Sequence, residues 1–464
     1  MGSIAPSFFS ADKFDISDET KARLDSLADS IYIRDAGQSE FLESVAEVLE
    51  SLVPVFESNK KYIEVFERLV EPERQIIFRV PWVDDKGCQQ VNRGFRVQMS
   101  SALGPYKGGL RFHPTVNLSV IKFLAFEQTF KNSLTNLMMG AGKGGSDFDP
   151  RGRSDGEVMR FCQSFMTELY RYIGPDTDVP AGDINVGARE IGFLFGQYKR
   201  LANEFNGVLT GKDLRWGGSL IRPEATGYGC VYFAQNYCNY KKTTLTGKKC
   251  LVSGSGNVAQ YTTEKLLDLG AIPITMSDSS GYILEPNGIT RKDLEFIMDL
   301  KNNKRGRLSE YLNYSKTAKF VENKKPWAEP ADYAFPSATQ GEVVYDDALT
   351  MAKNNVRGIF EGANMPSTRE AISVFKKSNM MFGPGKAANA GGVAVSGLEM
   401  AQNSQRSQWT REIVDEKLSF IMKDIFDMSL ASANDYGLQD DVQQGANIAG
   451  FLKVAESMIQ QGIV

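Results

Sequence analysis

The sequence predicts an α/β protein of two domains, and three features support that prediction. The chain has 464 residues, which is more than a single hydrophobic core normally serves. A loop rich in glycine and proline interrupts it near residues 211–224. Beyond this loop, short apolar runs alternate with helical patterns, which favours a mostly parallel sheet covered by helices.

The half before the loop mixes helical and strand-like periodicities. The glycines of 140–145 interrupt a helical pattern, and Asp84–Gly87 has the composition of a hairpin turn. The elements expected in this half are helices at 18–72, 117–139 and 156–172 and strands at 76–83 and 91–99.

The half after the loop repeats a strand–helix pattern, with a helix that runs to Gly270 after the first strand. The strands expected there are Cys250–Ser253, Ile272–Met276, Tyr333–Phe335 and Gly358–Phe360. We expect one domain over residues 1–217 and another over 218–429. A C-terminal helix of about 430–464 is expected to pack back on the first domain.

The composition excludes several classes of function. His113 is the only histidine, so proton transfer near neutral pH must rest on lysines and carboxylates whose pKa values burial has shifted. The net charge of −4 argues against nucleic-acid binding, and no apolar run is long enough for a membrane span. Five cysteines without a C-x-x-C pair predict no metal site and a cytoplasmic location.

A dinucleotide-binding turn is expected at residues 254–259. Gly254-Ser255-Gly256-Asn257-Val258-Ala259 fits the pattern G-x-G-x-x-A between a strand and a helix. Gly254 permits a tight turn, and Gly256 lets the backbone approach a pyrophosphate, which the helix N-terminus then binds.

The same region leaves the choice of dinucleotide open. Asp278 follows the second strand, where an acid usually binds the ribose 2′-hydroxyl of NAD. The hydroxyls of Ser255 and Ser279 can instead donate to the 2′-phosphate of NADP, with Asp278 only capping the strand.

Three lysines stand out in the first half. Lys107 and Lys143 lie among glycines, where the backbone can approach a ligand and a desolvated ammonium loses basicity. Lys131 follows Gln128 on a helix, and its simpler alternative is a surface ion pair with Glu127. Lys143 does not belong to a phosphate-binding P-loop, because Gly144 replaces the required Ser or Thr. Asp183 is equally compatible with a turn or a helix cap.

Six motifs of the chain are distinctive when they are taken together. They are Gly104–Pro114, Phe126–Asn132, Gly142–Asp149, Asp178–Asp183, Arg222–Gly227 and Gly385–Gly392. In sequence, order and spacing they closely resemble the glutamate dehydrogenases, in particular the shorter, hexameric, NADP-linked enzymes of bacteria and fungi. The resemblance covers nearly the whole chain after about residue 30.

The resemblance implies a role for each matching residue. Lys143 activates water and Asp183 transfers protons to and from nitrogen. The substrate's side-chain carboxylate is bound by Lys107 and Ser396, and its α-carboxylate by Lys131, Gln128 and Gly182. The residues implied in cofactor binding are Arg222, Thr226, Gly254, Ser255, Gly256, Asn257, Val258, Asp278, Ser279 and Asn389.

The resemblance also implies the activity and the assembly. Glutamate would be deaminated reversibly to 2-oxoglutarate and ammonium with NADP, in a cleft between a substrate-binding, oligomerisation domain and a dinucleotide-binding domain of a homohexamer. Some relatives have lysine at the position of Ser280, so an NAD-preferring enzyme is one alternative. The others are a dehydrogenase for an apolar amino acid and a non-catalytic nucleotide-binding protein. His113 is given no proton-transfer role.

Overall fold

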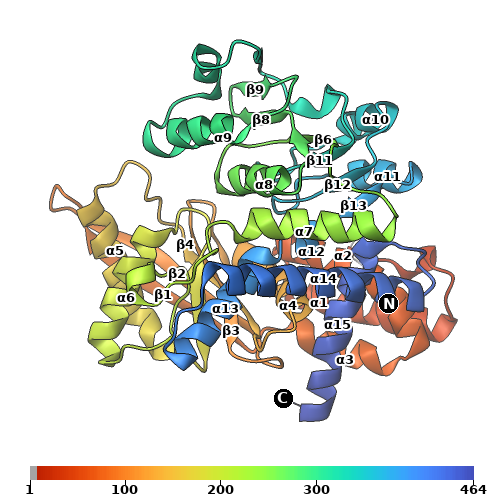
Figure 1. Cartoon of the computed structure of the whole chain (residues 1–464). Coiled ribbons are helices and arrows are strands. Elements are labelled where there is room, and N and C mark those ends of the chain that lie inside the picture. The colour runs from red at the N-terminus through yellow and green to blue at the C-terminus, as the bar shows by residue number, and fades with distance from the viewer. Residues whose placement is uncertain (1–7, 464) are drawn as a thin grey trace.

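The computed structural model describes residues 8–463, and residues 1–7 of the predicted first domain lie outside this range. Two lobes are visible, and the helices near both ends of the chain lie in the lower one (Figure 1). The elements before the connecting loop are α1 (Asp18–Arg34), α2 (Ser39–Ser58), α3 (Lys61–Val70), β1 (Arg74–Val83), β2 (Gln89–Ser100), β3 (Tyr106–Phe112), α4 (Leu118–Leu134), β4 (Ala141–Ser146), α5 (Asp155–Leu169), β5 (Asp178–Gly182) and α6 (Ala188–Ala202).

The remaining elements alternate strands and helices before ending in four helices. They are α7 (Ala225–Tyr240), β6 (Lys249–Val252), α8 (Asn257–Asp268), β7 (Ile272–Pro273), β8 (Thr275–Asp278), β9 (Gly281–Leu284), α9 (Arg291–Met298), β10 (Lys319–Glu322), β11 (Tyr333–Phe335), α10 (Tyr345–Lys353), β12 (Gly358–Phe360), α11 (Arg369–Lys377), β13 (Met381–Gly383), α12 (Gly385–Ala388), α13 (Gly391–Gln405), α14 (Arg411–Asp435) and α15 (Val442–Gln461).

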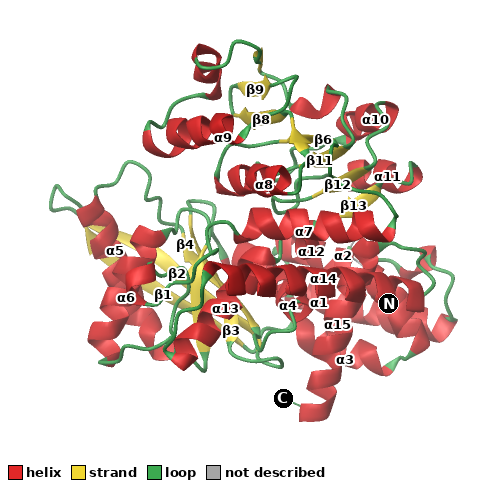
Figure 2. Cartoon of the chain, viewed as in Figure 1, coloured by secondary structure: helices red, strands yellow, loops and turns green. Residues whose placement is uncertain are grey.

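The lower lobe contains a mixed sheet of five strands in the order β1-β2-β4-β3-β5 (Figure 2). The predicted hairpin of β1 and β2 is confirmed, with Val83 opposite Gln89. The pairs β3–β4 and β3–β5 are parallel. Helix α15 packs on α2, α3 and α4, where Phe451 meets Phe56 and Phe66.

The helix expected at 117–139 ends at Leu134, before the glycines of 140–145. The glycine-rich segments around Lys107 and Lys143 are the strands β3 and β4, which the sequence did not predict. Glycine is required there because backbones and a side chain come very close. A Cβ atom on Gly108 would lie 1.7 Å from the Gly142 carbonyl oxygen. A Cβ atom on Gly144 would lie 2.7 Å from the Phe95 oxygen and 3.1 Å from Cδ of Arg96. Because glycine has no side chain, these strands show no alternation of apolar and polar residues, and sequence periodicity does not reveal them.

The upper lobe contains the predicted parallel sheet, in the order β13-β12-β11-β6-β7. The strand expected at Ile272–Met276 is divided between two sheets: β7 pairs with β6, whereas β8 pairs antiparallel with β9. Ile272 and Ile274 donate backbone hydrogen bonds to β6 at 2.8 and 2.9 Å. Pro273 between them faces the outer edge of the sheet, so its missing N–H removes no hydrogen bond from the ladder. The chain then enters the three-stranded sheet β10-β9-β8.

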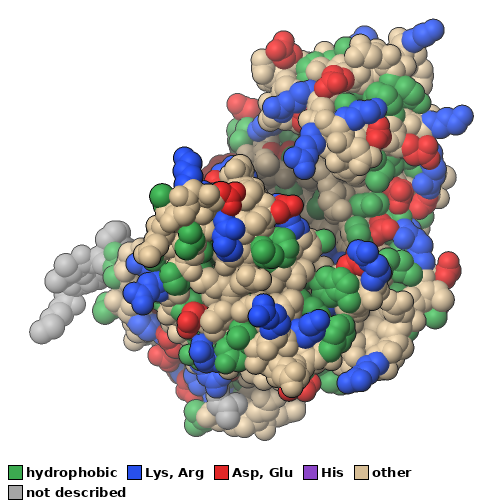
Figure 3. Space-filling view, turned by 90° about the vertical axis from the view of Figure 1, so that its left-hand side faces the viewer, with side chains coloured by type: hydrophobic (Ala, Val, Ile, Leu, Met, Phe, Trp, Pro, Cys, Tyr) green, Lys and Arg blue, Asp and Glu red, His purple; other side chains and the backbone are tan. Residues whose placement is uncertain are grey.

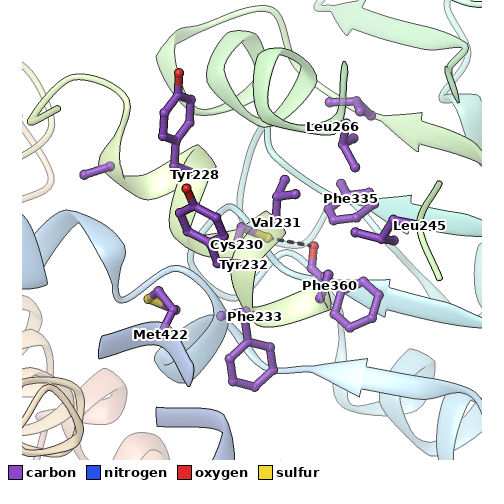
Figure 4. Close-up of a cluster of buried hydrophobic side chains, with 14 of the residues drawn as sticks. Tyr228, Cys230, Val231, Tyr232, Phe233, Leu245, Leu266, Phe335, Phe360 and Met422 are labelled. Carbon is purple, nitrogen blue, oxygen red and sulfur yellow. Dashed lines mark hydrogen bonds between the residues drawn. The ribbon is translucent and has the colours of Figure 1, made fainter. Parts of the chain in front are cut away.

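Helix α7 forms the centre of the largest apolar cluster, between the parallel sheet and α14 (Figure 4). Phe233, Phe360 and Met422 are buried there, and the thiol of Cys230 donates to the Phe360 oxygen at 3.5 Å. Helix α7 has no charged side chain, and its residues 227–234 are all buried, as expected of a helix that is enclosed on every side.

No helix among residues 8–463 combines the length and the hydropathy that a membrane crossing requires.

The buried ion pair between Arg96 and Asp178 is expected to be essential for folding. Neither side chain has exposed surface, and Arg96 Nε donates to Asp178 Oδ2 at 2.9 Å. Arg96→Met would leave a carboxylate buried without its partner, and should lower the free energy of unfolding by about 3–5 kcal/mol. Chemical denaturation measures this. Arg171→Met, which removes an exposed pair with Glu168, is the control and should stay near wild type; equal effects of the two substitutions would contradict the prediction.

Candidate active site

Three neighbouring strands bring Arg111, Lys143 and Asp183 together. Arg111 lies on β3 opposite Gly145 of β4, and Gly109 lies opposite Ala181 of β5. Lys143 is on β4 and Asp183 directly follows β5. Glycine at 109 is needed, since a Cβ atom there would lie 2.9 Å from that of Asp183.

Asp183 is held between two cations. Lys143 Nζ donates to its Oδ1 at 3.0 Å, and Arg111 Nε donates to its Oδ2 at 2.7 Å. Burial raises the pKa of Asp183, but Lys143 and Arg111 outweigh it and hold this pKa below its ordinary value. Burial lowers the pKa of Lys143, and Asp183 only partly opposes that shift. The result is an ionised carboxylate beside an ammonium that loses its proton more easily than usual.

Lys107 is 1% exposed on β3, close to other positive charges. Burial lowers its pKa well below the ordinary value, and Arg222 and Arg96 lower it further. Glu399 opposes this shift and also acts on Arg222, which is partly exposed. Nε of Arg222 is buried without a hydrogen-bond partner. Neither cation forms an ion pair among the described residues, which is typical of a site for an anionic ligand.

Lys131 lies on α4, and the simple alternative of a pair with Glu127 is wrong. Lys131 Nζ donates to Asn389 Oδ1, while Glu127 pairs with Lys386 at 3.5 Å. Burial and the charge of Lys143 lower the pKa of Lys131 to about 8.

Gln128 lies one turn before Lys131, and its side chain donates to Asn132 Oδ1 at 2.6 Å. Asn132 in turn donates to the backbone oxygen of Lys107 at 3.0 Å. The side-chain amides of Gln128 and Asn132 therefore connect α4 with β3, the strand that carries Lys107. Ser396, on α13, is 2% exposed, and no hydrogen bond links it to these residues in the described part of the chain.

The predicted phosphate-binding turn has the expected geometry. Gly254 has φ +84°, which favours glycine, and its N–H donates to Ser277 Oγ at 2.7 Å. Gly256 has open space where a Cβ atom would be and caps α8, whose first residue Asn257 is exposed. The N–H groups of this helix end, which include that of Val258, are thus accessible to a phosphate.

Asp278 is already occupied by the protein itself. Its Oδ1 accepts hydrogen bonds from the backbone and the hydroxyl of Ser280, and its Oδ2 accepts one from the Leu308 N–H at 2.9 Å. Lys301 lies 3.4 Å from the same oxygen. These contacts leave little capacity for a ribose hydroxyl, as the capping interpretation of Asp278 requires.

Two cations at this place were missed by the sequence analysis. Besides Lys301, Arg307 donates to Ser279 Oγ at 2.7 Å and is exposed. Both lie more than twenty residues further along the chain, after α9, so no local motif marks them. Arg111 was also missed, although it lies within the quoted motif Gly104–Pro114.

Thr226 lies between α13, the helix of Ser396, and α8, the helix that follows the phosphate-binding turn. It is the second residue of α7, and a Cβ atom on Gly392 of α13 would lie 2.5 Å from its hydroxyl. The next residue, Gly227, lets α7 touch α8 beside the Val258 oxygen. Figure 3 shows the surface hollowed between the lobes. Among residues 8–463, no cluster of three His, Cys, Asp or Glu side chains has the geometry to hold a metal ion.

Comparisons with known proteins identify the family. Residues 217–462 match the Glutamate/Leucine/Phenylalanine/Valine dehydrogenase model, and residues 72–200 match the dimerisation domain of the same enzymes. The chain belongs to this family. The NADP-specific glutamate dehydrogenase of Giardia intestinalis is 60% identical over 93% of this chain and 97% of that protein. The NADP-specific enzyme of Escherichia coli is 54% identical over 95% of this chain and 99% of that protein.

A solved structure gives the same result. The crystal structure of Plasmodium falciparum glutamate dehydrogenase superposes with a TM-score of 0.95 and 55% identity, and all of both chains is covered. The predicted family and the predicted α/β fold with two domains are confirmed. The predicted activity and cofactor agree with the names of these relatives.

Glu361 orders the loop that holds Asn389. The side chain of Asn389 donates to Ala363 O at 3.0 Å and to Asn364 Oδ1 at 2.9 Å. Glu361 begins this loop, and its Oε2 accepts the Gly385 N–H at the start of α12 at 2.7 Å. Burial raises the pKa of Glu361 to about 7.

This shift predicts a pH dependence of stability. A carboxyl group with a raised pKa binds more protons when folded than when unfolded, so its contribution to stability falls as the pH rises through about 4.5 to about 7. Glu361→Gln should therefore flatten the decrease in Tm over that range, as measured by thermal melts. Glu370→Gln, at an exposed position of α11, should keep the wild-type slope. Identical slopes for wild type and Glu361→Gln would show that the shift is absent.

Proposed function

We propose that this chain catalyses the reversible oxidative deamination of L-glutamate to 2-oxoglutarate and ammonium with NADP. The observation that carries this proposal is the set of three cations without carboxylate partners, Lys107, Lys131 and Arg222, around the Lys143–Asp183 pair. Glutamate and 2-oxoglutarate each bring two carboxylates, which charge-assisted hydrogen bonds to such cations can bind.

The proposed roles of the residues follow from their surroundings. Lys107 and Ser396 bind the side-chain carboxylate. Lys131 binds the α-carboxylate together with Gln128 and the backbone at Gly182. Arg222 was expected to contact the cofactor, but its charge acts on both Lys107 and Lys131, which supports a contact with a substrate carboxylate instead.

The proposed chemistry uses the unequal basicities of Lys143 and Asp183. With its lowered pKa, Lys143 can take a proton from water as that water adds to the substrate iminium carbon. Asp183 exchanges protons with the substrate nitrogen, and Arg111 keeps its carboxylate in place. Hydride acceptance from the α-carbon is the chemistry that NADP would supply when bound, and the chain's own part is to orient the two reactants and to exclude water.

The proposed cofactor site fits NADP better than NAD. Gly254, Ser255 and Gly256 face the pyrophosphate, and Thr226 and Asn389 face the nicotinamide half. The carboxylate oxygens of Asp278 already accept hydrogen bonds from the protein, so the usual acceptor for the 2′-hydroxyl of NAD is lost. Lys301, Arg307 and the hydroxyl of Ser279 instead offer donors to the 2′-phosphate of NADP.

The assembly and the location are proposals as well. We propose a homohexamer in the cytoplasm, with domains of residues 1–217 and 218–429. The edge strand β1 leaves one side unpaired and exposes Ile77 by 51%, which supports contact with another subunit. The five cysteines are free thiols, and four of them are buried, which supports a reducing compartment.

A dehydrogenase for apolar amino acids is disfavoured by Lys107. A buried ammonium in the side-chain pocket would meet no partner on an apolar substrate, and its desolvation would not be offset. A non-catalytic protein would show no oxidation of NADPH that depends on ammonium and 2-oxoglutarate, so this absorbance assay tests the proposal directly.

Replacement of Lys107 tests the substrate. Lys107→Leu should lower kcat/KM for 2-oxoglutarate by about tenfold to a hundredfold, because a charged hydrogen-bond donor is lost. The Tm should change little, since leucine suits a buried position. His113→Asn, outside the proposed contacts, is the control and should keep measurable activity. Unchanged kinetics of Lys107→Leu would refute the assignment.

Replacement of Arg307 tests the cofactor. Arg307→Ser should lower kcat/KM with NADPH by about tenfold and leave the value with NADH almost unchanged, because only the 2′-phosphate loses a partner. The neighbouring exposed residue provides a matched control, and Arg305→Ser should leave both values near wild type. Equal losses with the two cofactors would contradict a contact with the 2′-phosphate.

A further inference from the structure

Helix α13 is fastened along one face to the segment 209–219, which joins the two lobes between α6 and α7. Gln402 donates to Ser219 Oγ at 2.8 Å, and Asn403 donates to the Gly217 oxygen at 2.7 Å. Glu399, one turn earlier on the same face, has no exposed surface. It is the only charged residue of the three.

The carboxylate of Glu399 is saturated by this segment. Its Oε2 accepts the Gly211 N–H at 3.0 Å, and its Oε1 accepts the Lys212 N–H at 3.3 Å. Lys212 Nζ lies 3.1 Å from Oε1, with a side chain that is 1% exposed. Such a pair is expensive to bury, so a charged residue at this place calls for a function beyond stability.

The segment that Glu399 holds has an unfavourable backbone. Leu209, which is fully buried, has φ +64°, and Gly211 has φ +86°. A left-handed conformation is strained for leucine and persists only where surrounding contacts impose it. Lys212 Nζ donates to the Leu209 oxygen, so the ion pair is one of those contacts.

The same ion pair spans the two sides of the proposed side-chain pocket. Ser396 lies one turn before Glu399 on α13, on the same helix face. On the other side, the Thr210 N–H donates to the Pro180 oxygen of β5 at 2.9 Å. Strand β5 pairs with β3, where Val179 lies opposite Lys107. Glu399 thus sets the position of the helix of Ser396 relative to the strand of Lys107.

We propose that Glu399 is a positioning residue that determines specificity for a carboxylate on the substrate's side chain, by fixing Ser396 relative to Lys107. This inference rests on the proposed function, in which those two residues bind that carboxylate. The negative charge of Glu399 also acts on Lys107 and on Arg222.

The test compares a substrate that has this carboxylate with one that lacks it. Norvaline has the same chain length as glutamate but ends in a methyl group. Glu399→Gln should lower kcat/KM for glutamate by about tenfold, mainly through KM, and change the value for norvaline by less than about threefold. Equal losses with both amino acids, or no loss with either, would overturn the proposal.

A binding measurement provides a readout that needs no turnover. Glutarate has both carboxylates but no reacting nitrogen or keto group, and calorimetry on the NADP-saturated protein gives its Kd. Glu399→Gln should raise the Kd for glutarate about tenfold. If the wild-type chain neither oxidises glutamate nor binds glutarate, the proposed function itself fails. If it does both and Glu399→Gln matches it, only the present inference fails.

Three variants control for folding. Asp415→Asn on α14 removes a carboxylate that pairs with Lys265 of α8, and should leave both selectivity and glutarate binding near wild type. Glu399→Asp keeps the charge and should restore part of the selectivity. If Glu399→Gln does not fold, the double variant Lys212→Met/Glu399→Gln removes both buried charges and should show the same loss. Wild-type selectivity in the folded double variant would overturn the proposal.

Discussion

The guanidinium of Arg96 crosses the five-stranded sheet from β2 to reach Asp178 at the start of β5, with β4 and β3 between them. On the way the Arg96 side chain passes Gly142 and Gly144, whose Cβ atoms would lie 3.4 Å from its Nη2 and 3.1 Å from its Cδ, respectively. The Gly108 oxygen accepts a further hydrogen bond from it at 3.1 Å. The glycines beside Lys143 are therefore explained by the neighbouring strands and by this buried arginine together. The position of Asp183 at the end of β5 depends on this arrangement.

The cations of the site differ in whether a carboxylate lies beside them. Arg96, Lys143 and Lys212 each have a carboxylate within 4 Å, whereas Lys107, Lys131 and Arg222 have none among the described residues. Unbalanced buried charge is unfavourable for the free protein. A ligand with two negative charges would balance these cations. The free protein is therefore less stable than it would be without them, and in return the site is complementary to such a ligand.

The sequence predicts the local features of this site better than the long-range ones. The turn at Gly254–Gly256 could be recognised because strand, turn and helix lie within a few residues. Lys301 and Arg307 could not, because the fold brings them to Asp278 from beyond α9. Glu399 was missed for the same reason: an acid in an apolar helix is distinctive, but its partner Lys212 lies far away in the sequence. The boundary at residue 217 and the individual site roles stay predictions.

The strands around Lys107 and Lys143 show another limit. Periodicity is read from side chains, and these segments have few because neighbouring backbones occupy the space. The division of the strand expected at Ile272–Met276 is a further limit, because the sequence shows one apolar run but not the two sheets that its halves join. Strands β7 and β8 are almost continuous in the sequence, yet β7 joins the parallel sheet and β8 joins the three-stranded sheet.

The contact between α7 and α8 at Gly227 has a mechanical consequence. A Cβ atom there would lie 2.5 Å from the Thr262 nitrogen and 2.8 Å from the Val258 oxygen, so the two helices touch backbone to backbone. Such a contact leaves no side chain that could change rotamer and allow sliding. Thr226 and the phosphate-binding turn therefore form one rigid body, which fixes the span available to a dinucleotide. Any opening of the cleft must be accommodated outside this unit and leaves that span unchanged.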